Sequence, residues 1–421
     1  MYDITTLPGG LRVITAPMPH MASVSVGVWI GIGGRHEARP LCGISHFIEH
    51  LLFKGTVRRS AKQISQTVEG IGGYLNAFTG EENTCYYAKA SQQHLSLLLD
   101  VLGDMYRHPK LTGADITKER QVIKEELLMY RDQPDHYVQE LLTETLWPGH
   151  ALGRALTGTP ESLDRMHRAT LLDFKTRNYV PVNTVVAIAG NCDHAVSVAR
   201  VANQFPARTP GRSARITPVT AMQRAPQLRF LTKNVEQTHL AIGIRSYSRH
   251  DARRYALKLL SVILGENMSS RLFQTIREDH GLAYSIQSAT SFFADTGVFL
   301  ISAGLDMKRL PKALRLILKE LGKVACRAPS ADELRRAQDY AIGQMRLGME
   351  STNNQMMWCG EHLLAYGCVQ TPDEIERRIA AVTTAQIQET AADIFREHRL
   401  NVAVITPSKD EDAVRKLLTF E

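Results

Sequence analysis

The chain has 421 residues, of which 22% are charged, and a formal net charge of +7. This length is expected to divide into two domains of roughly 200 residues each. No apolar run approaches the roughly 18 residues that a membrane span needs, and the basic residues are dispersed, so neither membrane insertion nor nucleic-acid binding is expected. The start lacks the basic and apolar regions of a secretory signal. We therefore expect a protein of the bacterial cytoplasm, or of an organellar matrix if a leader was removed.

The first half of the chain alternates between strand and helix patterns. Alternating apolar residues in "ASVSVGVWIGIGG", residues 22–34, predict a strand, and "SHFIEHLLFKGT", residues 45–56, predicts a helix. A second helix and then paired strands over residues 72–90 follow. Two amphipathic helices come next, the last of them in "ADITKERQVIKEELLMY", residues 114–130.

The second half repeats this plan from "QTHLAIGIRSYSR", residues 237–249, onward. The offset is about 217 residues, measured from Asp115 to Asp332 at the starts of two corresponding helices. Between the halves, residues 205–226 are rich in Pro, Arg and Thr and have no periodicity. We predict an α+β fold of two homologous α/β-sandwich-like halves, each a mostly antiparallel sheet covered by helices. The predicted domains are residues 1–205 and 227–421, joined by a linker at 206–226.

The helix at residues 45–56 carries two histidines on one face. His46 and His50 are four residues apart, so both imidazoles can bind one metal ion, and Glu49 projects beside them. Zinc lowers the pKa of a bound water, and a carboxylate beside it can accept the proton as general base. This is the H-x-x-E-H pattern. The alternative is a helix with two hydrogen-bonded core histidines, but the second repeat has no such motif, which favours a functional role.

A third ligand is expected from the helix at residues 114–130. Its apolar positions recur at helical spacing, and Glu126 lies at the edge of the predicted inward face. Glu119 lies about two turns earlier on the same face. Glu125 is the rival ligand, although its neighbours one turn away make it look outward.

These motifs resemble the inverzincin peptidases, the family of pitrilysin, insulin-degrading enzyme and the mitochondrial processing peptidase. The resemblance rests on "GISHFIEHLLFKGT", "GGYLNAFTGEENTCYYA", "ERQVIKEEL" and "LGENMSSRLFQTIREDHGLAYSI", and it extends over essentially the whole chain. In size the chain is similar to the two-domain beta subunit of the processing peptidase and its bacterial relatives. The resemblance implies a zinc metalloendopeptidase with His46, His50 and Glu126 as ligands, Glu49 as base and Glu119 as supporting acid.

The resemblance also implies how a substrate is held. In the family, the segment that matches Asn76, Ala77 and Phe78 is an exposed strand edge to which a peptide adds as an extra strand. Arg277 and Tyr284 match a pair that holds substrate carbonyls and stabilises the oxyanion. In two-domain members this pair comes from the partner, so we expect a homodimer with Arg277 and Tyr284 contributed in trans.

One position departs from the processing-peptidase pattern. Two acidic residues follow the ligand glutamate in that enzyme and select an arginine near the cleavage point. Here the matching positions hold His136 and Glu140, of which only Glu140 fits. We therefore expect cleavage of short or unfolded peptides within a dimeric chamber, with residues 1–205 as the zinc-binding catalytic domain. The alternative is a non-catalytic scaffold or core subunit of a larger complex.

Overall fold

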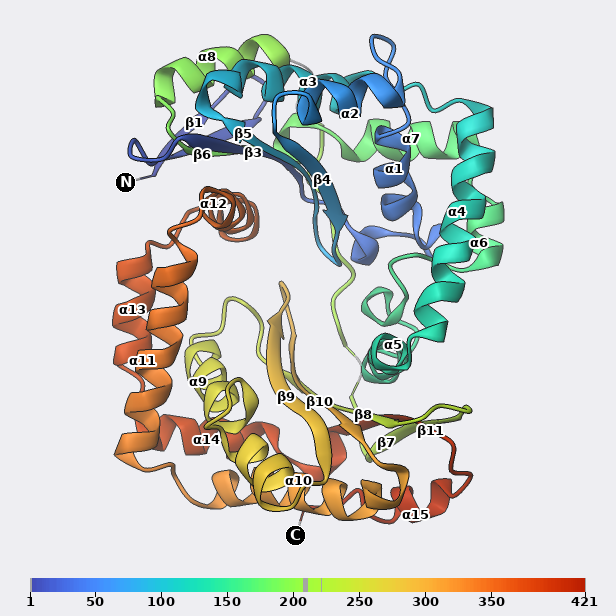
Figure 1. The fold of residues 1–421 in the computed structure, drawn as a ribbon, viewed down its shortest axis with the longest axis vertical. Coiled ribbons are helices and arrows are strands. Elements are labelled where there is room, and N and C mark those ends of the chain that lie inside the picture. The colour runs from blue at the N-terminus through green and yellow to red at the C-terminus, as the bar shows by residue number, and fades with distance from the viewer. Residues whose placement is uncertain (1, 207–210, 221, 421) are drawn as a thin grey trace. The chain divides into compact units, whose positions relative to one another are not determined.

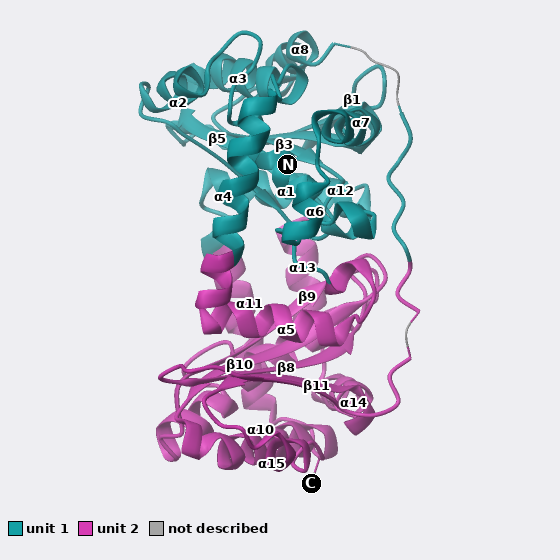
Figure 2. Cartoon of the chain, turned by 90° about the vertical axis from the view of Figure 1, so that its right-hand side faces the viewer, with its two compact units in different colours: residues 1–127, 154–217, 347–370 teal, residues 128–153, 218–346, 371–421 magenta. Residues whose placement is uncertain are grey.

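The computed structural model describes residues 2–206, 211–220 and 222–420. It divides into two compact units, and neither is continuous in sequence (Figure 2). Unit 1 comprises residues 1–127, 154–217 and 347–370, and unit 2 comprises residues 128–153, 218–346 and 371–421. These bounds differ from the contiguous division at residues 1–205 and 227–421, because each unit includes one helical segment from the other half of the sequence. The contiguous division stays a prediction about the two repeats.

Unit 1 is built on a six-stranded sheet. The strands lie in the order β1-β2-β6-β3-β5-β4, and every neighbouring pair is antiparallel except β2 with β6. The strands are β1 (Asp3–Thr6), β2 (Arg12–Pro17), β3 (Ser23–Ile30), β4 (Tyr74–Thr79), β5 (Thr84–Ser91) and β6 (Thr184–Gly190). Strand β4 therefore lies at one edge of the sheet, with β5 as its neighbour.

Helices cover one face of this sheet, where the apolar residues of β3 alternate inward. Val24, Val26 and Val28 are fully buried in a core shared with the helices, because alternate side chains of a strand point to the same face. Figure 1 shows α2, α3 and α8 on this face. The helices of the unit are α1 (Ile44–Leu52), α2 (Ala61–Glu69), α3 (Leu95–Arg107), α4 (Gly113–Asp132, whose last residues belong to unit 2), α6 (Pro160–Asp164), α7 (Arg168–Asn178), α8 (His194–Gln204) and α12 (Thr352–Tyr366).

Helix α12 covers the other face of the sheet, although it comes from the second half of the sequence (Figure 1). Two glycines allow this close approach. A Cβ on Gly27 would lie 2.3 Å from the sulfur of Met356, and a Cβ on Gly360 would lie 2.0 Å from Nε1 of Trp29. The helix is therefore part of the unit 1 core.

Unit 2 repeats this architecture on a five-stranded sheet. The strands lie in the order β7-β11-β8-β10-β9, and only β7 and β11 are parallel. The strands are β7 (Gln227–Thr232), β8 (Thr238–Ser246), β9 (Ala283–Phe292), β10 (Gly297–Leu305) and β11 (Leu400–Thr406). The helices are α5 (Pro134–Leu146), α9 (Arg254–Gly265), α10 (Leu310–Cys326), α11 (Ala331–Gly348), α13 (Pro372–Ala380), α14 (Thr384–Ile394), α15 (Glu411–Arg415) and the π-helix η6 (Phe273–Asp279).

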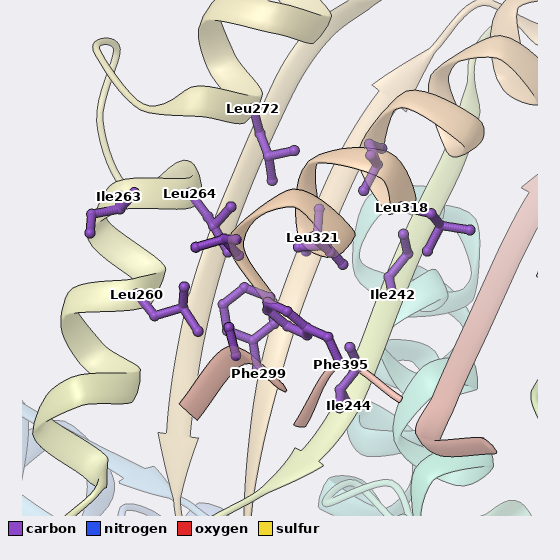
Figure 3. Close-up of a cluster of buried hydrophobic side chains, with 14 of the residues drawn as sticks. Ile242, Ile244, Leu260, Ile263, Leu264, Leu272, Phe299, Leu318, Leu321 and Phe395 are labelled. Carbon is purple, nitrogen blue, oxygen red and sulfur yellow. The ribbon is translucent and has the colours of Figure 1, made fainter. Parts of the chain in front are cut away.

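The main core of unit 2 lies between this sheet and helices α9, α10 and α14. Ile242 and Ile244 of β8 point into it, and the rings of Phe299 and Phe395 meet edge to face with their centroids 5.3 Å apart (Figure 3). Helix α5, from the first half of the sequence, covers the opposite face, where a Cβ on Gly243 would lie 2.9 Å from Leu146. The predicted α+β class with two homologous halves is confirmed.

The remaining regular elements are short 3₁₀ turns. They are η1 (Gly34–His36), η2 (Arg39–Leu41), η3 (Gln92–His94), η4 (Ala151–Gly153), η5 (Pro181–Asn183), η7 (Met307–Arg309) and η8 (Glu397–Arg399). In the predicted linker, the described residues contain no helix or strand, and residues 207–210 and 221 lie outside the described part of the chain. Among the described helices, none has the length and apolarity needed to cross a membrane.

Candidate metal centre

Helix α1 holds the H-x-x-E-H motif with one face buried and one face partly open. Its apolar residues Phe47, Ile48 and Leu51 are buried at no more than 1% exposure, whereas His46 and His50 retain 13% and 22% of their side-chain surface. The spacing of four residues brings the two rings together, with centroids 4.6 Å apart. The helix thus directs both imidazoles to one point.

The carboxylate of Glu37 caps the first turn of α1. Both oxygens of Glu37 accept hydrogen bonds from backbone amides, Oε2 from Gly43 at 2.6 Å and Oε1 from Ser45 at 2.8 Å. These amides belong to the first turn of α1, where no intrahelical partner exists. Burial raises the pKa of Glu37 to about 7, and the two amide hydrogen bonds oppose that rise. Glu37 therefore replaces the side-chain cap that Gly43 cannot provide.

Glu126 of helix α4 completes a cluster with the two histidines. Its Oε2 lies 3.8 Å from Nε2 of His46 and 3.5 Å from Nε2 of His50. One ligand atom from each residue lies within 4.8 Å of the others, which makes this a possible metal site. Zinc bonds of about 2.0–2.1 Å in a tetrahedral arrangement would separate neighbouring ligand atoms by roughly 3.3–3.5 Å. Two imidazoles and a carboxylate at these separations fit a zinc ion.

Burial keeps His46 in the neutral form that a metal ligand requires. Burial, followed by the nearby His50, lowers the pKa of His46 to about 3, so the ring is neutral and can donate a lone pair. Its Nδ1 is buried and has no hydrogen-bond partner among the described residues. The atom of His46 that faces Glu126 is Nε2, so this unpaired Nδ1 does not distinguish a zinc ligand from a core histidine.

Glu119 contacts Nδ1 of His50, the ring nitrogen other than the one that faces Glu126. Its side chain is 1% exposed, and its Oε2 lies 3.2 Å from Nδ1 of His50. Its Oε1 forms an ion pair with Nζ of Lys54 at 3.0 Å. A carboxylate on Nδ1 selects the tautomer that leaves Nε2 free, and Nε2 is the atom that faces Glu126. Glu119 is thus a positioning residue for a ligand and does not itself face the cluster. By contrast, Glu125 is exposed and lies 3.4 Å from Nε2 of Gln121.

Glu49 lies beside the cluster and is held by a residue that sequence reasoning missed. Oγ1 of Thr79, the last residue of β4, donates a hydrogen bond of 2.5 Å to Oε2 of Glu49. Burial raises the pKa of Glu49, and the hydrogen bond from Thr79 acts in the opposite direction. One carboxylate oxygen is thereby engaged and the other remains for a reacting group. Thr79 directly follows Phe78 in the segment that the sequence analysis singled out, but no local pattern indicates its partner.

The predicted substrate strand is the edge strand β4. Asn76, Ala77 and Phe78 pair with Tyr87, Tyr86 and Cys85 of β5. Asn76 is exposed, whereas Ala77 and Phe78 are half-buried, and the ring of Phe78 meets Trp29 edge to face at 5.5 Å. The Ala77 amide donates to Oδ1 of Asn76 at 2.8 Å. This strand and the cluster belong to the same unit.

The other predicted residues belong to unit 2. The guanidinium of Arg277 lies 5.9 Å from the ring centre of Tyr284, whose side chain is 76% exposed. Glu140 lies on helix α5, where burial raises its pKa and Arg131 opposes that effect. His136, on the first turn of α5, lines a cleft of about 530 Å³ with polar residues of the sheet, among them His239. Arg277 and Tyr284 thus form a pair, and Glu140 and His136 belong to one helix.

Comparisons with known proteins show the family of this chain. Residues 12–160 match the family model described as insulinase, peptidase family M16, and residues 165–340 match the model described as peptidase M16 inactive domain. A protein of Streptomyces coelicolor, named an uncharacterised zinc protease, is 38% identical, over 98% of this chain and 91% of its own. The chain belongs to peptidase family M16.

Further similar proteins and structures match over nearly the whole chain. An uncharacterised zinc protease of Bacillus subtilis is 35% identical over 96% of this chain and 98% of its own. Among solved structures, a protease from Helicobacter pylori has a TM-score of 0.90 at 22% identity, over 97% of this chain and 100% of that one. A putative M16-like peptidase from Alicyclobacillus acidocaldarius has a TM-score of 0.87 at 18% identity, over 97% and 98%. The resemblance to inverzincin peptidases is thereby confirmed.

Proposed function

We propose that this M16 chain is a zinc endopeptidase of short or unfolded peptides. The observation that carries the proposal is the convergence of His46, His50 and Glu126 beside Glu49. These four groups are the ligands and the base that a hydrolytic zinc site requires. The relatives named zinc proteases support the same activity.

The chemistry assigns a separate task to each side chain. His46, His50 and Glu126 would hold a zinc ion, which would supply Lewis acidity to lower the pKa of water and to polarise a carbonyl. Glu49 accepts the proton of the attacking water on the oxygen that Thr79 does not occupy. It then delivers that proton to the leaving amine, so it ends the cycle ionised again.

The substrate would bind as an added strand. Strand β4 is an edge strand, and main-chain hydrogen bonds at such an edge bind a peptide with little regard to its sequence. Asn76, Ala77 and Phe78 would form this contact. The peptide would have to replace the hydrogen bond from the Ala77 amide to Asn76. The protein would therefore bind extended peptides of many different sequences.

Oxyanion stabilisation would come from a second copy of the chain. The guanidinium of Arg277 lies 5.9 Å from the ring centre of Tyr284, and Tyr284 is exposed for contact with a substrate. We propose that they act in trans in a homodimer that encloses the peptide. Glu140 would contact the substrate from helix α5. This arrangement requires a phenol and a guanidinium directed at the developing negative charge.

The second candidate is a non-catalytic scaffold subunit. The observation in its favour is that residues 165–340 match a model described as an inactive domain. That match lies outside α1, so it leaves the cluster and its base unaffected. The two candidates differ in whether purified protein hydrolyses peptides.

The experiment is hydrolysis of quenched fluorescent peptides of about 10–20 residues, with zinc content measured alongside. We expect Glu49→Gln to lower kcat by about 10²–10⁴-fold while zinc stays bound. The control Glu69→Gln replaces an exposed carboxylate of the same unit and should retain activity. A chelator should abolish cleavage. Zinc-loaded wild type that cleaves no peptide of a library would support the scaffold instead.

A further inference from the structure

A short segment between β3 and α1 contains two buried charged side chains. Residues Gly33–Glu37, here called the clamp segment, include the turn η1. Arg35 is 2% exposed and Glu37 is 5% exposed. Burying a charge is unfavourable unless hydrogen bonds and opposite charges compensate it. Each of these residues therefore has a specific partner elsewhere in unit 1.

The carboxylate end of the clamp segment holds the helix of the metal ligands. Glu37 accepts from the amides of Gly43 and Ser45, and the next residue along the chain is His46. Gly43 has a φ of +90°, and a Cβ there would lie 2.7 Å from the carbonyl oxygen of Thr157. The start of α1 is thus confined by a backbone that tolerates only glycine and by a carboxylate that binds its first turn.

The guanidinium end of the clamp segment holds the hairpin of β4 and β5. Nη1 of Arg35 donates to Oε1 of Glu82 at 2.7 Å, within the turn that follows β4. The backbones also meet, since the Arg35 amide donates to the carbonyl of Glu81 at 2.7 Å. A Cβ on Gly33 would lie 2.2 Å from the carbonyl oxygen of Gly80, so the approach is direct. The turn after Thr79 is therefore fixed to the clamp segment.

We propose that Glu37 and Arg35 are positioning residues that hold α1 and the β4 edge in one register. The two elements meet at the hydrogen bond from Thr79 to Glu49, and the clamp segment binds both of them. Glu37 fixes the ligand helix, and Arg35 fixes the strand that would receive the peptide. This inference rests on the proposed function for its catalytic consequence, but the clamp itself is a property of the fold.

The two ends of the clamp segment should give different defects. Glu37→Gln keeps the size of the side chain but can accept at only one oxygen, so the turn beside His46 loses a hydrogen bond and zinc affinity should fall by about tenfold. Glu37→Asp keeps the charge but is one methylene shorter, and it should show the same loss. Gly33→Ala displaces the turn after β4, so it should raise KM for a peptide while zinc affinity stays at the wild-type value.

The test combines zinc titration, peptide kinetics and hydrogen exchange on the full chain. Exchange should accelerate over residues 43–47 in Glu37→Gln and over residues 80–84 in Gly33→Ala. The matched control is Asp104→Asn, a buried carboxylate that accepts from Thr56 and Arg59. It should lower Tm without changing zinc affinity.

Three results bear on the clamp. Unchanged exchange at residues 43–47 in both Glu37 variants would overturn it, whatever the protein does with zinc. Faster exchange there with wild-type zinc affinity would show that Glu37 stabilises α1 without affecting the metal ligands, and it would overturn the role of Glu37 in positioning them. Wild type that binds no zinc and cleaves no peptide refutes the proposed function. Glu37 is then no metal-positioning residue, and the exchange data still decide whether the segment holds helix and hairpin together.

Discussion

Replacing Glu119 with glutamine separates a buried support of the metal site from a metal ligand. Glu119 is 1% exposed and faces Nδ1 of His50 at 3.2 Å and Nζ of Lys54 at 3.0 Å. The amide of Glu119→Gln can still accept from His50, but it loses the charge that stabilises both partners. Outer-shell substitutions of this kind weaken metal affinity about 10–100-fold, which corresponds to about 1.4–2.7 kcal/mol.

The assay is zinc affinity measured by competition with a chromogenic chelator, with peptide hydrolysis at saturating zinc recorded in parallel. At saturating zinc, activity should recover most of the wild-type value, because Glu49 is unaltered. Glu125→Gln is the matched control, since Glu125 is exposed on the same helix. Equal zinc affinity in wild type and Glu119→Gln would refute the positioning role. Zinc loss as complete as that of Glu126→Gln would instead make Glu119 a ligand.

Three further predictions concern Glu49 and the α12 layer. Thr79→Val removes the hydrogen bond that lowers the pKa of Glu49. The acidic limb of the pH profile of kcat/KM should therefore move to higher pH, and kcat/KM should fall by about tenfold. An acidic limb at the wild-type pH would contradict this prediction. Met356→Ala empties a fully buried site under β3 and should cost about 2–5 kcal/mol by denaturant unfolding. Gly360→Ala places a Cβ 2.0 Å from Nε1 of Trp29 and should cost about 1–3 kcal/mol; wild-type stability in either variant would mean that α12 is loosely packed.

Local sequence patterns predicted the elements of the site, because a helix converts spacing into direction. Helical spacing places His46 and His50 on one face of their helix. It also places Glu126 at the inward edge of the helix at residues 114–130, so the two imidazoles and the carboxylate can meet. The choice of Glu126 over Glu125 followed from the same periodicity. The structure brings Glu126 to the histidines and leaves Glu125 exposed.

Contacts between distant segments could not be predicted in this way. The hydrogen bond from Thr79 to Glu49 and the cap of Glu37 on Gly43 and Ser45 depend on how a hairpin, a turn and a helix pack. Neither residue belongs to a short motif that names its partner. The assignment of α5 to unit 2 and of α12 to unit 1 was equally hidden, because an amphipathic helix shows that it has an apolar face but not which sheet will cover it.

Helices α5 and α12 each pack on the unit formed mainly by the other half of the sequence, and this affects how the chain folds during synthesis. A ribosome releases the six strands of unit 1 well before α12, so the sheet face around Trp29 stays bare until about residue 366 has emerged. Early-exposed apolar sheet surface is an aggregation hazard and a substrate for chaperones. The same arrangement of α5 and α12 can be tested by expressing the two halves of the chain as separate fragments. Two fragments separated at residues 206–226 each lack one layer that the other supplies, so they should be recovered together when co-expressed and poorly when expressed alone.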